Sequence, residues 1–551
     1  MTALSRRHRI AVLATVCLAV FAINLDTTIV NVALPSLTRQ LGAGTSTLQW
    51  VVDGYSLAFA ALVLIGGSIG DRFGRRPVLL AGLVGFAIAS TFGGILHSSP
   101  GLIAVRFVMG AFAALIYPTT LSIISSAYPD RRERAGAIGV WGAVTGLGVA
   151  VGPVTGGLLL AHFWYGSVFL ALVPAAVVAA LATALVVPES REPGAARLDL
   201  PGLLASSAAI AWLVYTIIEA PGHGWGSART LGGFAGTAVI GTVFVVLERH
   251  TAQPMLDVSL FKVPAFSAAS GAVTVAFFAL FGFIFLISQY FQFIRRYGTL
   301  STGVRILPVA VSIAVGSVIG ARLASRSGTR VLVVTGLVVF GLAFAWIAVS
   351  ATTEAYVQIA VQMVVMGLGL GLTSTPATES ILSVLPPARA GLGSAVNDAT
   401  REAGGALGVA VIGSIYSSVF LHHLVSSPLR ALPTPAFDLA RTSVGAALAV
   451  AGQAPGSARL VAAVTASFMS GLHIACLAAA AVCWVGALGA LRLPGRPAPD
   501  GSAAIDPGPA PRRIRTARVR SMPERPTTSS SAWAGTRWVG SPPRPVGHRP
   551  R

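Results

Sequence analysis

Residues 49–97 read QWVVDGYSLAFAALVLIGGSIGDRFGRRPVLLAGLVGFAIASTFGGILH. This stretch contains two apolar runs, 49–69 and 77–97, on either side of a short segment with one aspartate and three arginines. Each run has the roughly 20 mostly apolar residues that a helix needs to cross a membrane. The stretch therefore predicts two membrane-spanning helices joined by a tight, charged turn.

Runs of the same kind recur along the whole chain, and we expect fourteen spanning helices. Their predicted ranges are 10–34, 49–69, 77–97, 101–123, 136–160, 165–187, 199–219, 230–247, 265–291, 303–322, 331–350, 355–378, 400–421 and 461–491. Only 11% of the 551 residues are charged and 54% are apolar, so the charges are too few to cover a soluble fold of this size. A membrane β-barrel is excluded, because its strands alternate over about 10 residues. The predicted fold class is all-α, a polytopic membrane protein, which also excludes a cytosolic enzyme.

The two ends of the chain differ from the spans. Arginines within 6–9 precede the first apolar run, as in a signal peptide, but the run continues through Asn24 and Asp26 without a clear cleavage site. We therefore expect a first spanning helix after a cytoplasmic N-terminus at 1–9. Residues 494–551 are rich in Pro, Arg, Ser and Gly and lack an apolar period, which predicts a disordered basic cytoplasmic tail.

Basic residues between the spans predict the orientation, because cytoplasmic loops carry an excess of Lys and Arg. Clusters of three occur at 6–9, 72–76, 131–134 and 322–330, which all fall on one side if the spans alternate. Before the tail, this side has 17 Lys and Arg residues and the other side has eight. Three of those eight run against the rule: Arg295, Arg296 and Arg305. The balance predicts a multi-pass protein of the plasma membrane with both termini in the cytoplasm.

Ionisable residues inside the spans are candidates for function, because a charge within a bilayer costs several kcal/mol. They are Asp26, Asp53, Arg106, Glu219, Glu379, Asp398, Arg401 and Glu402. Asp53, Glu219 and Glu379 lie near the ends of predicted spans. Asp398, Arg401 and Glu402 lie at the start of the thirteenth predicted span. An ion pair between Asp26 and Arg106 is reasonable, because each charge lowers the other's burial cost. Burial also favours the neutral form of a carboxyl group, so such a group can exchange a proton near neutral pH.

Two glycine patterns stand out. The fifth span has the pattern G-x-x-x-G-P-x-x-G-G, formed by Gly148, Gly152, Pro153, Gly156 and Gly157. Small residues at this spacing form a smooth face for close helix contact, although static packing explains them equally well. The turn after the second span contains Gly67, Asp71, Arg72, Gly74, Arg75 and Arg76. Glycine allows a tight turn there, and the aspartate can meet a helix N-terminus or an arginine.

Together these motifs resemble the major facilitator superfamily, and within it the fourteen-span drug:proton antiporters. Residues 67–76 resemble its signature loop, 102–110 its helix 4 motif and 148–157 its antiporter helix 5 motif. Residues 25–35 and 50–57 resemble the first and second helices of the fourteen-span group. Met109 departs from the helix 4 motif, which usually has glutamine there.

The resemblance implies two six-helix bundles, at 10–187 and 265–491, with two extra linking helices at 199–247. Such carriers work by alternating access, in which two bundles rock around a site near the midplane of the membrane. The second half should contain a weaker copy of the signature loop, for which Gly316 to Arg330 is the candidate.

The resemblance also implies roles for single residues. Asp26 matches a carboxylate that binds protons or cationic substrates, and Arg106 matches an arginine that modulates it. Asp53 matches a second acidic position, and Glu402, near Asp398, matches one on the thirteenth helix. Arg401 departs from some multidrug members, and we expect it to neutralise Glu402. The turn residues Gly67, Asp71, Arg72, Gly74, Arg75 and Arg76 would form a conformational gate.

The leading hypothesis is a proton-coupled exporter of hydrophobic, cationic drugs or antibiotics. The alternatives are a dedicated exporter of one endogenous metabolite, a proton symporter, and a membrane sensor or scaffold. No phosphate-binding loop or cysteine-based metal motif is present, so we expect no metal, no cofactor and no enzyme activity, with energy from a proton gradient. The expected partners are a small-molecule substrate, protons and the lipid bilayer, without nucleic acid, and we expect a monomer. The sequence does not identify the substrate, because polar and aromatic side chains can line a pocket or pack between helices equally well. Examples of such side chains are Trp141, Gln289, Tyr290 and Gln292.

Overall fold

The computed structural model describes residues 5–191, 199–251, 258–350, 355–384 and 390–495. Fourteen helices in these ranges are long and apolar enough to cross a membrane, which confirms the predicted number, and no strand occurs among the described residues. In chain order they are α1 (Arg6–Leu41), α2 (Thr45–Phe73), α3 (Arg75–Ile95), α4 (Ser99–Ala127), α5 (Arg131–His162), α6 (Ser167–Leu170) continued by α7 (Leu172–Val186), α8 (Leu200–His223), α9 (Ala228–His250), α10 (Pro264–Gln289), α11 (Thr299–Ser327), α12 (Thr329–Ala348), α13 (Tyr356–Ser383), α14 (Ala390–Val425) and α17 (Ser457–Ala490).

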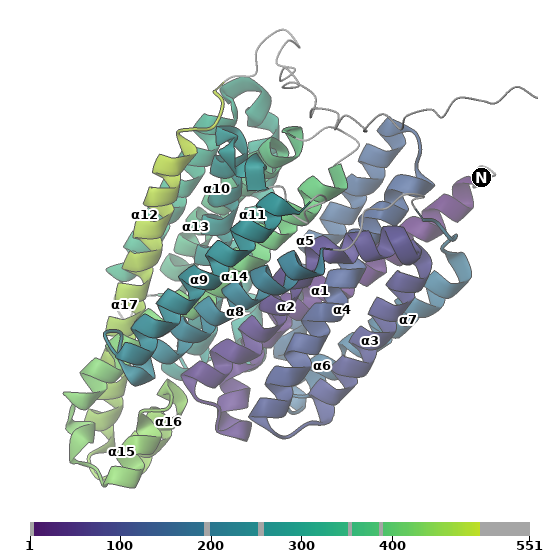
Figure 1. The fold of residues 1–551 in the computed structure, drawn as a ribbon. Helices are drawn as coiled ribbons and strands as arrows, with labels where there is room; N and C mark the ends of the chain where they lie inside the picture. Colours follow the sequence, from purple (N-terminus) through teal and green to yellow (C-terminus); the bar gives the residue numbers. More distant parts are fainter. Residues whose placement is uncertain (1–4, 192–198, 252–257, 351–354, 385–389, 496–551) are drawn as a thin grey trace, which may run out of the picture. The chain divides into compact units, whose positions relative to one another are not determined.

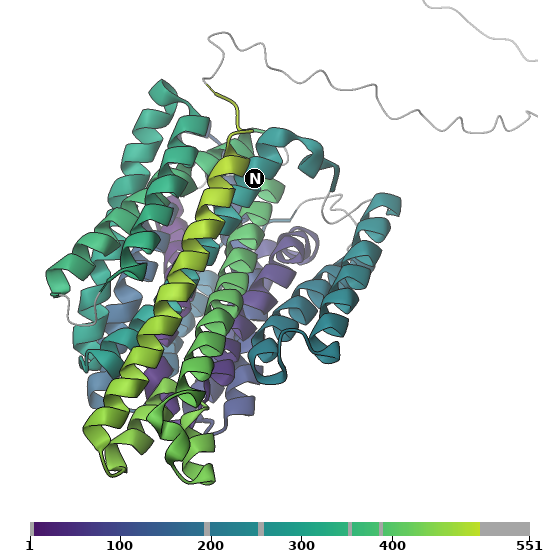
Figure 2. The same cartoon turned by 90° about the vertical axis from the view of Figure 1, so that its left-hand side faces the viewer.

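The spanning helices run side by side (Figures 1 and 2). We call the end of the described part where α1 begins at Arg6 the N-terminus side, and the end where α2 begins at Thr45 the far side. The predicted tail at 494–551 lies outside the described residues from 496 onwards.

Helices α1 to α7 pack against one another, and so do α10 to α14 with α17; we call these sets the first and second halves. The halves meet where α2 packs on α14 and where α5 packs on α11. By their contacts, the described residues form one compact unit, so the boundaries of the two predicted bundles stay a prediction.

The two predicted linking helices pack on the outside of this arrangement. Helix α8 packs on α9 and lies along the seam between α2 and α14. A small apolar cluster holds it there, in which Leu57 of α2 meets Ile217 of α8 and Ala406 of α14. Almost none of helix α9 is buried by other described residues, as expected for a helix whose apolar surface faces lipid.

A single glycine forms the turn between α2 and α3. Helix α2 continues through Phe73 and α3 starts at Arg75, so Gly74 alone reverses the chain, with φ 103° and ψ 134°. An L-amino acid with a side chain rarely adopts this backbone conformation. Gly328 makes the matching turn between α11 and α12 with φ 80° and ψ 152°. The weaker copy expected at 316–330 thus has the same backbone turn, although it lacks the aspartate.

Two predicted boundaries are wrong. The thirteenth span was expected at 400–421, but α14 begins ten residues earlier, at Ala390. Asp398, Arg401 and Glu402 therefore lie well inside the helix rather than at its start. Glycine and small residues, with Asn397 and Asp398, interrupt the apolar run before residue 400, so apolar counting placed this start too late.

The segment expected as a loop at 422–460 is largely helical. It contains the end of α14, a 3₁₀ turn at Pro428–Ala431, α15 (Thr434–Ala440) and α16 (Val444–Gln453). These short helices lie at the far side, next to α17 (Figures 1 and 2). Thr442 accepts a hydrogen bond from the backbone N–H of Thr45, 2.9 Å away, so this segment contacts the beginning of α2.

Two of the three arginines that run against the charge rule lie against aromatic rings. The Arg305 guanidinium lies 4.3 Å from the ring centre of Tyr297 and 5.1 Å from that of Tyr356. Arg295 donates a hydrogen bond to the Tyr297 hydroxyl at 3.2 Å. The charge rule describes how basic loops orient a protein while it inserts into the membrane. The cation–aromatic contacts stabilise these arginines in the folded protein, so they are a reasonable exception to the rule.

Candidate functional site

A small polar cavity of about 20 Å³ lies between the two halves. It takes residues from α1, α2 and α4 of the first half and from α14 of the second half. The lining residues are Ile23, Asn24, Thr27, Tyr55, Phe59, Tyr117, Asp398, Arg401 and Glu402. A site shared by both halves changes its shape when the halves move, which a site within one half does not.

Directly behind this cavity, Asp26 and Arg106 form a buried ion pair. Arg106 Nη1 lies 2.8 Å from Asp26 Oδ1 and 2.6 Å from Asp26 Oδ2, and both side chains are almost fully buried. Arg106 Nε also donates to the Val51 carbonyl at 2.9 Å, and Tyr55 covers the guanidinium at 4.5 Å. The expected pairing is therefore present, and its geometry offsets the cost of burying both charges.

Tyr55 places the ion pair one layer away from the cavity. Its ring lies against Arg106 on one side and lines the cavity on the other, whereas Asp26 and Arg106 are not lining residues. Asn24 and Thr27, which flank Asp26 on α1, do line the cavity. A molecule in the cavity would thus contact the neighbours of Asp26 and not its carboxylate.

Three charged residues of α14 line the opposite wall. Arg401 lies 3.8 Å from Asp398 and also packs 4.4 Å from the Phe277 ring centre. Arg401 therefore forms its ion pair with Asp398, while its charge also acts on the nearby Glu402. Glu402 is in electrostatic range of Arg401, Asp398 and Arg106, and its Oε2 atom is buried without a hydrogen-bond partner in the described structure.

Asp53 is fully buried in α2 but lies outside the cavity lining. Neither carboxylate oxygen has a hydrogen-bond partner in the described part of the chain. Its position near the start of the span left open whether water solvates it, and the helix packing buries it instead. The structure thus separates Asp53 from Asp398 and Glu402, with which the sequence had grouped it. Glu219, by contrast, is half-buried and accepts a hydrogen bond from Ser46 at 3.0 Å, and Glu379 is exposed.

The glycines of α5 pack directly against the helix that carries Asp26. A Cβ atom at Gly148 would lie 2.9 Å from the Phe21 carbonyl, and one at Gly156 would lie 2.8 Å from Ile29. Gly152 lies between them and would bring a Cβ against Thr28, whose hydroxyl donates to the Val149 carbonyl at 3.0 Å. These contacts fix the distance between α1 and α5.

The other face of α5 contacts the second half. A Cβ at Gly157 would lie 2.8 Å from Leu300 Cα on α11, and the Thr299 hydroxyl donates to the Gly157 carbonyl at 2.9 Å. Pro153 presents its carbonyl to Gly303 of α11. The α5 pattern therefore joins Asp26's helix to the second half.

We expect Gly152→Val to destabilise the protein by about 1–3 kcal/mol, because the new methyl groups force α1 and α5 apart. Gly146→Val is the matched control on the same helix, since a Cβ at Gly146 has no atom within 4 Å. Both changes have the same cost in helix propensity. Thermal unfolding of the purified variants measures the difference, and equal melting temperatures would show that the α1–α5 contact is unimportant.

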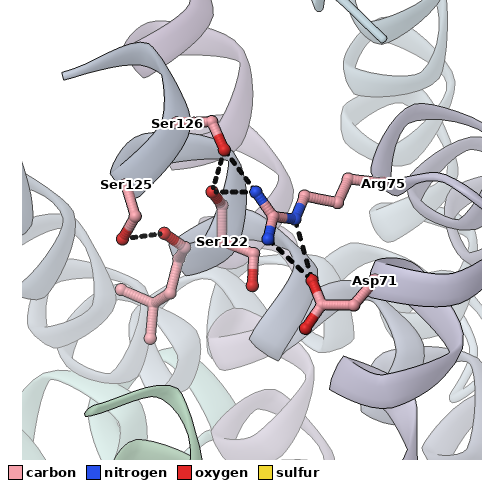
Figure 3. Close-up of polar contacts among 6 residues, drawn as sticks. Asp71, Arg75, Ser122, Ser125 and Ser126 are labelled. Carbon is pink, nitrogen blue, oxygen red and sulfur yellow. Dashed lines mark hydrogen bonds and ion pairs between the residues drawn. The ribbon is translucent and has the colours of Figure 1, made fainter. Parts of the chain in front are cut away.

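The turn residues form a network within the first half (Figure 3). Arg75 binds Asp71 with Nε at 2.9 Å and Nη2 at 2.8 Å, which confirms that the aspartate meets an arginine. Arg75 also donates to the Ser122 carbonyl at 3.3 Å and to the Ser126 hydroxyl, so it joins the α2–α3 turn to the end of α4.

The remaining turn residues complete this contact. Arg76 donates to the Ala184 carbonyl of α7, whereas Arg72 is exposed and lies beside Phe73. Gly67 packs near Pro118 of α4, and Gly74 forms the turn itself. The network therefore holds four helices of the first half together at the N-terminus side.

Hydrogen bonds join the two halves on the far side. Gln49 Nε2 of α2 donates to the carbonyls of Val409 and Ala410 on α14, both at 3.0 Å. Gln292 Nε2, at the end of α10, donates to the Val32 carbonyl of α1 at 2.9 Å. Both side chains are buried, so these bonds are sheltered from water.

The N-terminus side of α5 differs from its far side. Positions Gly136, Gly139, Gly142 and Gly146 have no atom within 4 Å of an added Cβ, whereas the glycines from Gly148 onwards are closely packed. Close packing along α5 therefore begins at Gly148, against α1, and includes the contact with α11 at Gly157.

Four uncharged cavity residues with polar groups received no role from the sequence: Asn24, Thr27, Tyr55 and Tyr117. Asn24 and Thr27 lie within one helical turn of Asp26, so their position next to a buried carboxylate was the available signal. Trp141, which could have served in a pocket or in packing, lies outside this cavity. It packs at 5.0 Å on the Tyr117 ring and donates to the Thr120 hydroxyl at 3.0 Å.

The fold and the cavity together define a multi-span membrane protein with a polar site between two halves. The model of the Major Facilitator Superfamily matches residues 16–409. The chain belongs to this superfamily, and it is a membrane transporter rather than an enzyme.

Comparison with curated proteins identifies similar relatives across most of the chain. Multidrug efflux pump LfrA of Mycolicibacterium smegmatis is 34% identical over 462 residues, which cover 84% of this chain and 91% of that protein. The tetracenomycin C resistance and export protein of Streptomyces glaucescens is 30% identical and covers 87% of this chain and 90% of its own length.

Among solved structures, a bacterial homologue of the human lysosomal transporter Spinster, in an inward-facing and unoccupied conformation, has a similar fold. It aligns with a TM-score of 0.61 at 17% identity, over 90% of this chain and all of that one.

Proposed function

We propose that this transporter exports hydrophobic, cationic drugs or antibiotics across the plasma membrane in exchange for protons. The main support is the cavity between the halves, in which Asp398 and Glu402 face α1 and α2. With Arg401 as the one lining cation, the ionised cavity carries net negative charge, which favours a cation. The multidrug efflux pump LfrA, similar along most of the chain, supports export as the direction.

The structure suggests a division of work between the carboxylates. Glu402 has an unpartnered oxygen at the cavity wall and is suited to contact a cationic substrate. Asp26 lies behind Tyr55 and has only Arg106 as a close charged partner, so it is suited to take up and release a proton. Substrate and proton would then compete for the same negative potential, which couples their binding without direct contact.

The far-side contacts support alternating access. If both termini are cytoplasmic, the far side faces outward and the described arrangement is closed to the outside. Opening outward requires that the bonds of Gln49, Gln292 and Thr299 to the opposite half break. Each such bond contributes about 0.5–1.5 kcal/mol, so a few of them can balance two conformations.

We expect Gln49→Leu to shift the protein toward the outward-open state by about tenfold, because its hydrogen bonds to Val409, Ala410 and Ser414 of α14 are lost. Spin labels on cysteines introduced by Phe163→Cys and Arg459→Cys, exposed positions of the two halves at the far side, report the change by pulsed dipolar spectroscopy. The three native cysteines would be replaced by alanine.

A longer distance between the labels in Gln49→Leu supports the proposed closure. Gln358→Leu, at the beginning of α13, is the control and should leave the distance distribution unchanged. An unchanged distribution in Gln49→Leu would argue against this side chain as part of the outer gate.

A susceptibility panel in an efflux-deficient bacterial host tests the proposed function. Expression of the wild-type chain should raise the inhibitory concentrations of several unrelated lipophilic cations. If none of the compounds is affected while the protein is present in the membrane, the proposal of drug efflux fails.

A dedicated exporter of a single compound is the second candidate. The similarity to the tetracenomycin C resistance and export protein favours it, since that name specifies one compound. The same panel separates the two, because a dedicated exporter would protect against one chemical class only.

A further inference from the structure

A second, larger hollow lies away from the central cavity, on the N-terminus side of the second half. It has a volume of about 630 Å³ and runs between the first part of α10 and the last part of α17. Its walls are apolar, and small residues form much of them: Ala268, Gly271, Ala272, Gly486 and Gly489. We call it the α10–α17 groove.

The length of the groove matches one leaflet of a membrane. Its lining residues extend from Pro264 to Val275 along α10 and from Ala481 to Arg492 along α17. At a rise of 1.5 Å per residue, each series covers roughly 17 Å. Half of the hydrocarbon core of a bilayer is about 15 Å thick. An acyl chain that lies in the groove would therefore end near the middle of the bilayer.

Two cations lie at the end of the groove nearest the N-terminus side. Lys262 ends the short helix before α10, and Arg492 follows α17; both are exposed and both line the groove. Neither side chain has an ion-pair or hydrogen-bond partner among the described residues. Lys262 is also the single lysine in the sequence.

The position of Arg492 is fixed by contacts from a neighbouring helix. Arg330, in the first turn of α12, donates from Nε to the Leu493 carbonyl at 2.6 Å. Its backbone N–H also donates to the Pro494 carbonyl at 3.3 Å. These hydrogen bonds thus hold the turn that contains Arg492 at the end of the groove.

We propose that the α10–α17 groove binds an anionic phospholipid, with its phosphate between Lys262 and Arg492 and one acyl chain along the small residues. Two unpartnered cations above an apolar groove of one-leaflet length are complementary to a negative headgroup and its chain. The basic segment at 496–551 of this chain is a poor occupant, because its arginines would be repelled by the same cations.

Three variants separate the parts of this site. Arg492→Gln removes one cation and leaves the groove intact. Gly271→Leu fills the groove and leaves both cations; a Cβ at Gly271 has no atom within 4 Å, so the side chain extends into open space. Arg326→Lys, at the exposed end of α11, places a second lysine on the same side but outside the groove.

The experiment measures the reaction rate of Lys262 with a water-soluble amine reagent, followed by peptide mass spectrometry. The full chain is placed in nanodiscs of phosphatidylcholine, with or without an equal part of phosphatidylglycerol. We expect phosphatidylglycerol to slow the reaction of Lys262 about fivefold, because its phosphate covers the amine. Arg492→Gln and Gly271→Leu should each remove most of this protection.

The controls distinguish a site from a general surface effect. The lysine introduced by Arg326→Lys should react at nearly the same rate in both lipid mixtures; equal slowing of both lysines would overturn the proposal. Glycerol phosphate added to phosphatidylcholine nanodiscs should not protect Lys262, and protection by it would mean that the groove is not used. An unchanged Lys262 rate with phosphatidylglycerol would also overturn the proposal.

Discussion

Asp26→Asn is expected to abolish export driven by a pH gradient while the protein still inserts into the membrane. Asparagine cannot bind and release a proton, so the variant loses the group proposed to couple the two fluxes. It keeps one side-chain oxygen that can accept from Arg106 Nη1, and Arg106 keeps its bond to Val51 and its contact with Tyr55. This loss is measured in everted membrane vesicles, in which an imposed pH gradient drives the uptake of a lipophilic cationic dye.

The control for this experiment is a carboxylate far from the site. Asp438→Asn changes an exposed residue of α15 that has a loose pair with Arg441 at 3.8 Å, and we expect it to leave dye transport unchanged. Both variants are compared at equal protein levels in the membrane. Full transport by Asp26→Asn would exclude a coupling role for this carboxylate.

Arg106→Leu should have the largest effect on stability, about 3–5 kcal/mol, because it leaves the Asp26 charge buried without a partner. Asp26 has Arg106 as its hydrogen-bonding partner in the described structure, and both side chains are almost fully buried. The double variant with Asp26→Asn should recover much of the loss, since no unpaired charge then remains. Thermal unfolding of the detergent-purified proteins measures all three differences.

The matched control is Arg441→Leu, which removes an arginine that is half exposed and should change stability by less than about 0.5 kcal/mol. If the double variant were as unstable as Arg106→Leu alone, the ion pair would not be the cause of the loss. Lost packing of the guanidinium against Tyr55 would then be the better explanation.

Much of the fold follows from apolar counting, because a spanning helix needs an uninterrupted run and few other structures do. The pairing of Asp26 with Arg106 was also predictable, since two buried opposite charges in one bundle stabilise each other. The start of α14 was not, because its first turns are rich in glycine and small residues and do not form a continuous apolar run. The helices at 428–453 were missed because they are too short for a spanning segment.

The residues that line the cavity could not all be predicted from the sequence. The order of residues along the chain does not show that Tyr55 separates Asp26 from the cavity. It also does not show that Arg401 forms its ion pair with Asp398 instead of Glu402. Both depend on how α1, α2 and α14 are rotated about their own axes, which is set by the close contacts of glycines such as Gly148 and Gly408. A glycine pattern such as that of the fifth span predicts a close helix contact, but it does not tell which helix is the partner.

The most direct test of the central claim is proton movement during substrate transport by the purified protein. Proteoliposomes with a pH-sensitive dye trapped inside would receive a lipophilic cationic substrate, and proton and substrate fluxes would be recorded together. We predict proton flux opposite in direction to substrate flux for the wild-type chain, and none for Asp26→Asn. Substrate transport by the wild type without proton movement, or with protons moving in the same direction, would contradict the proposed antiport.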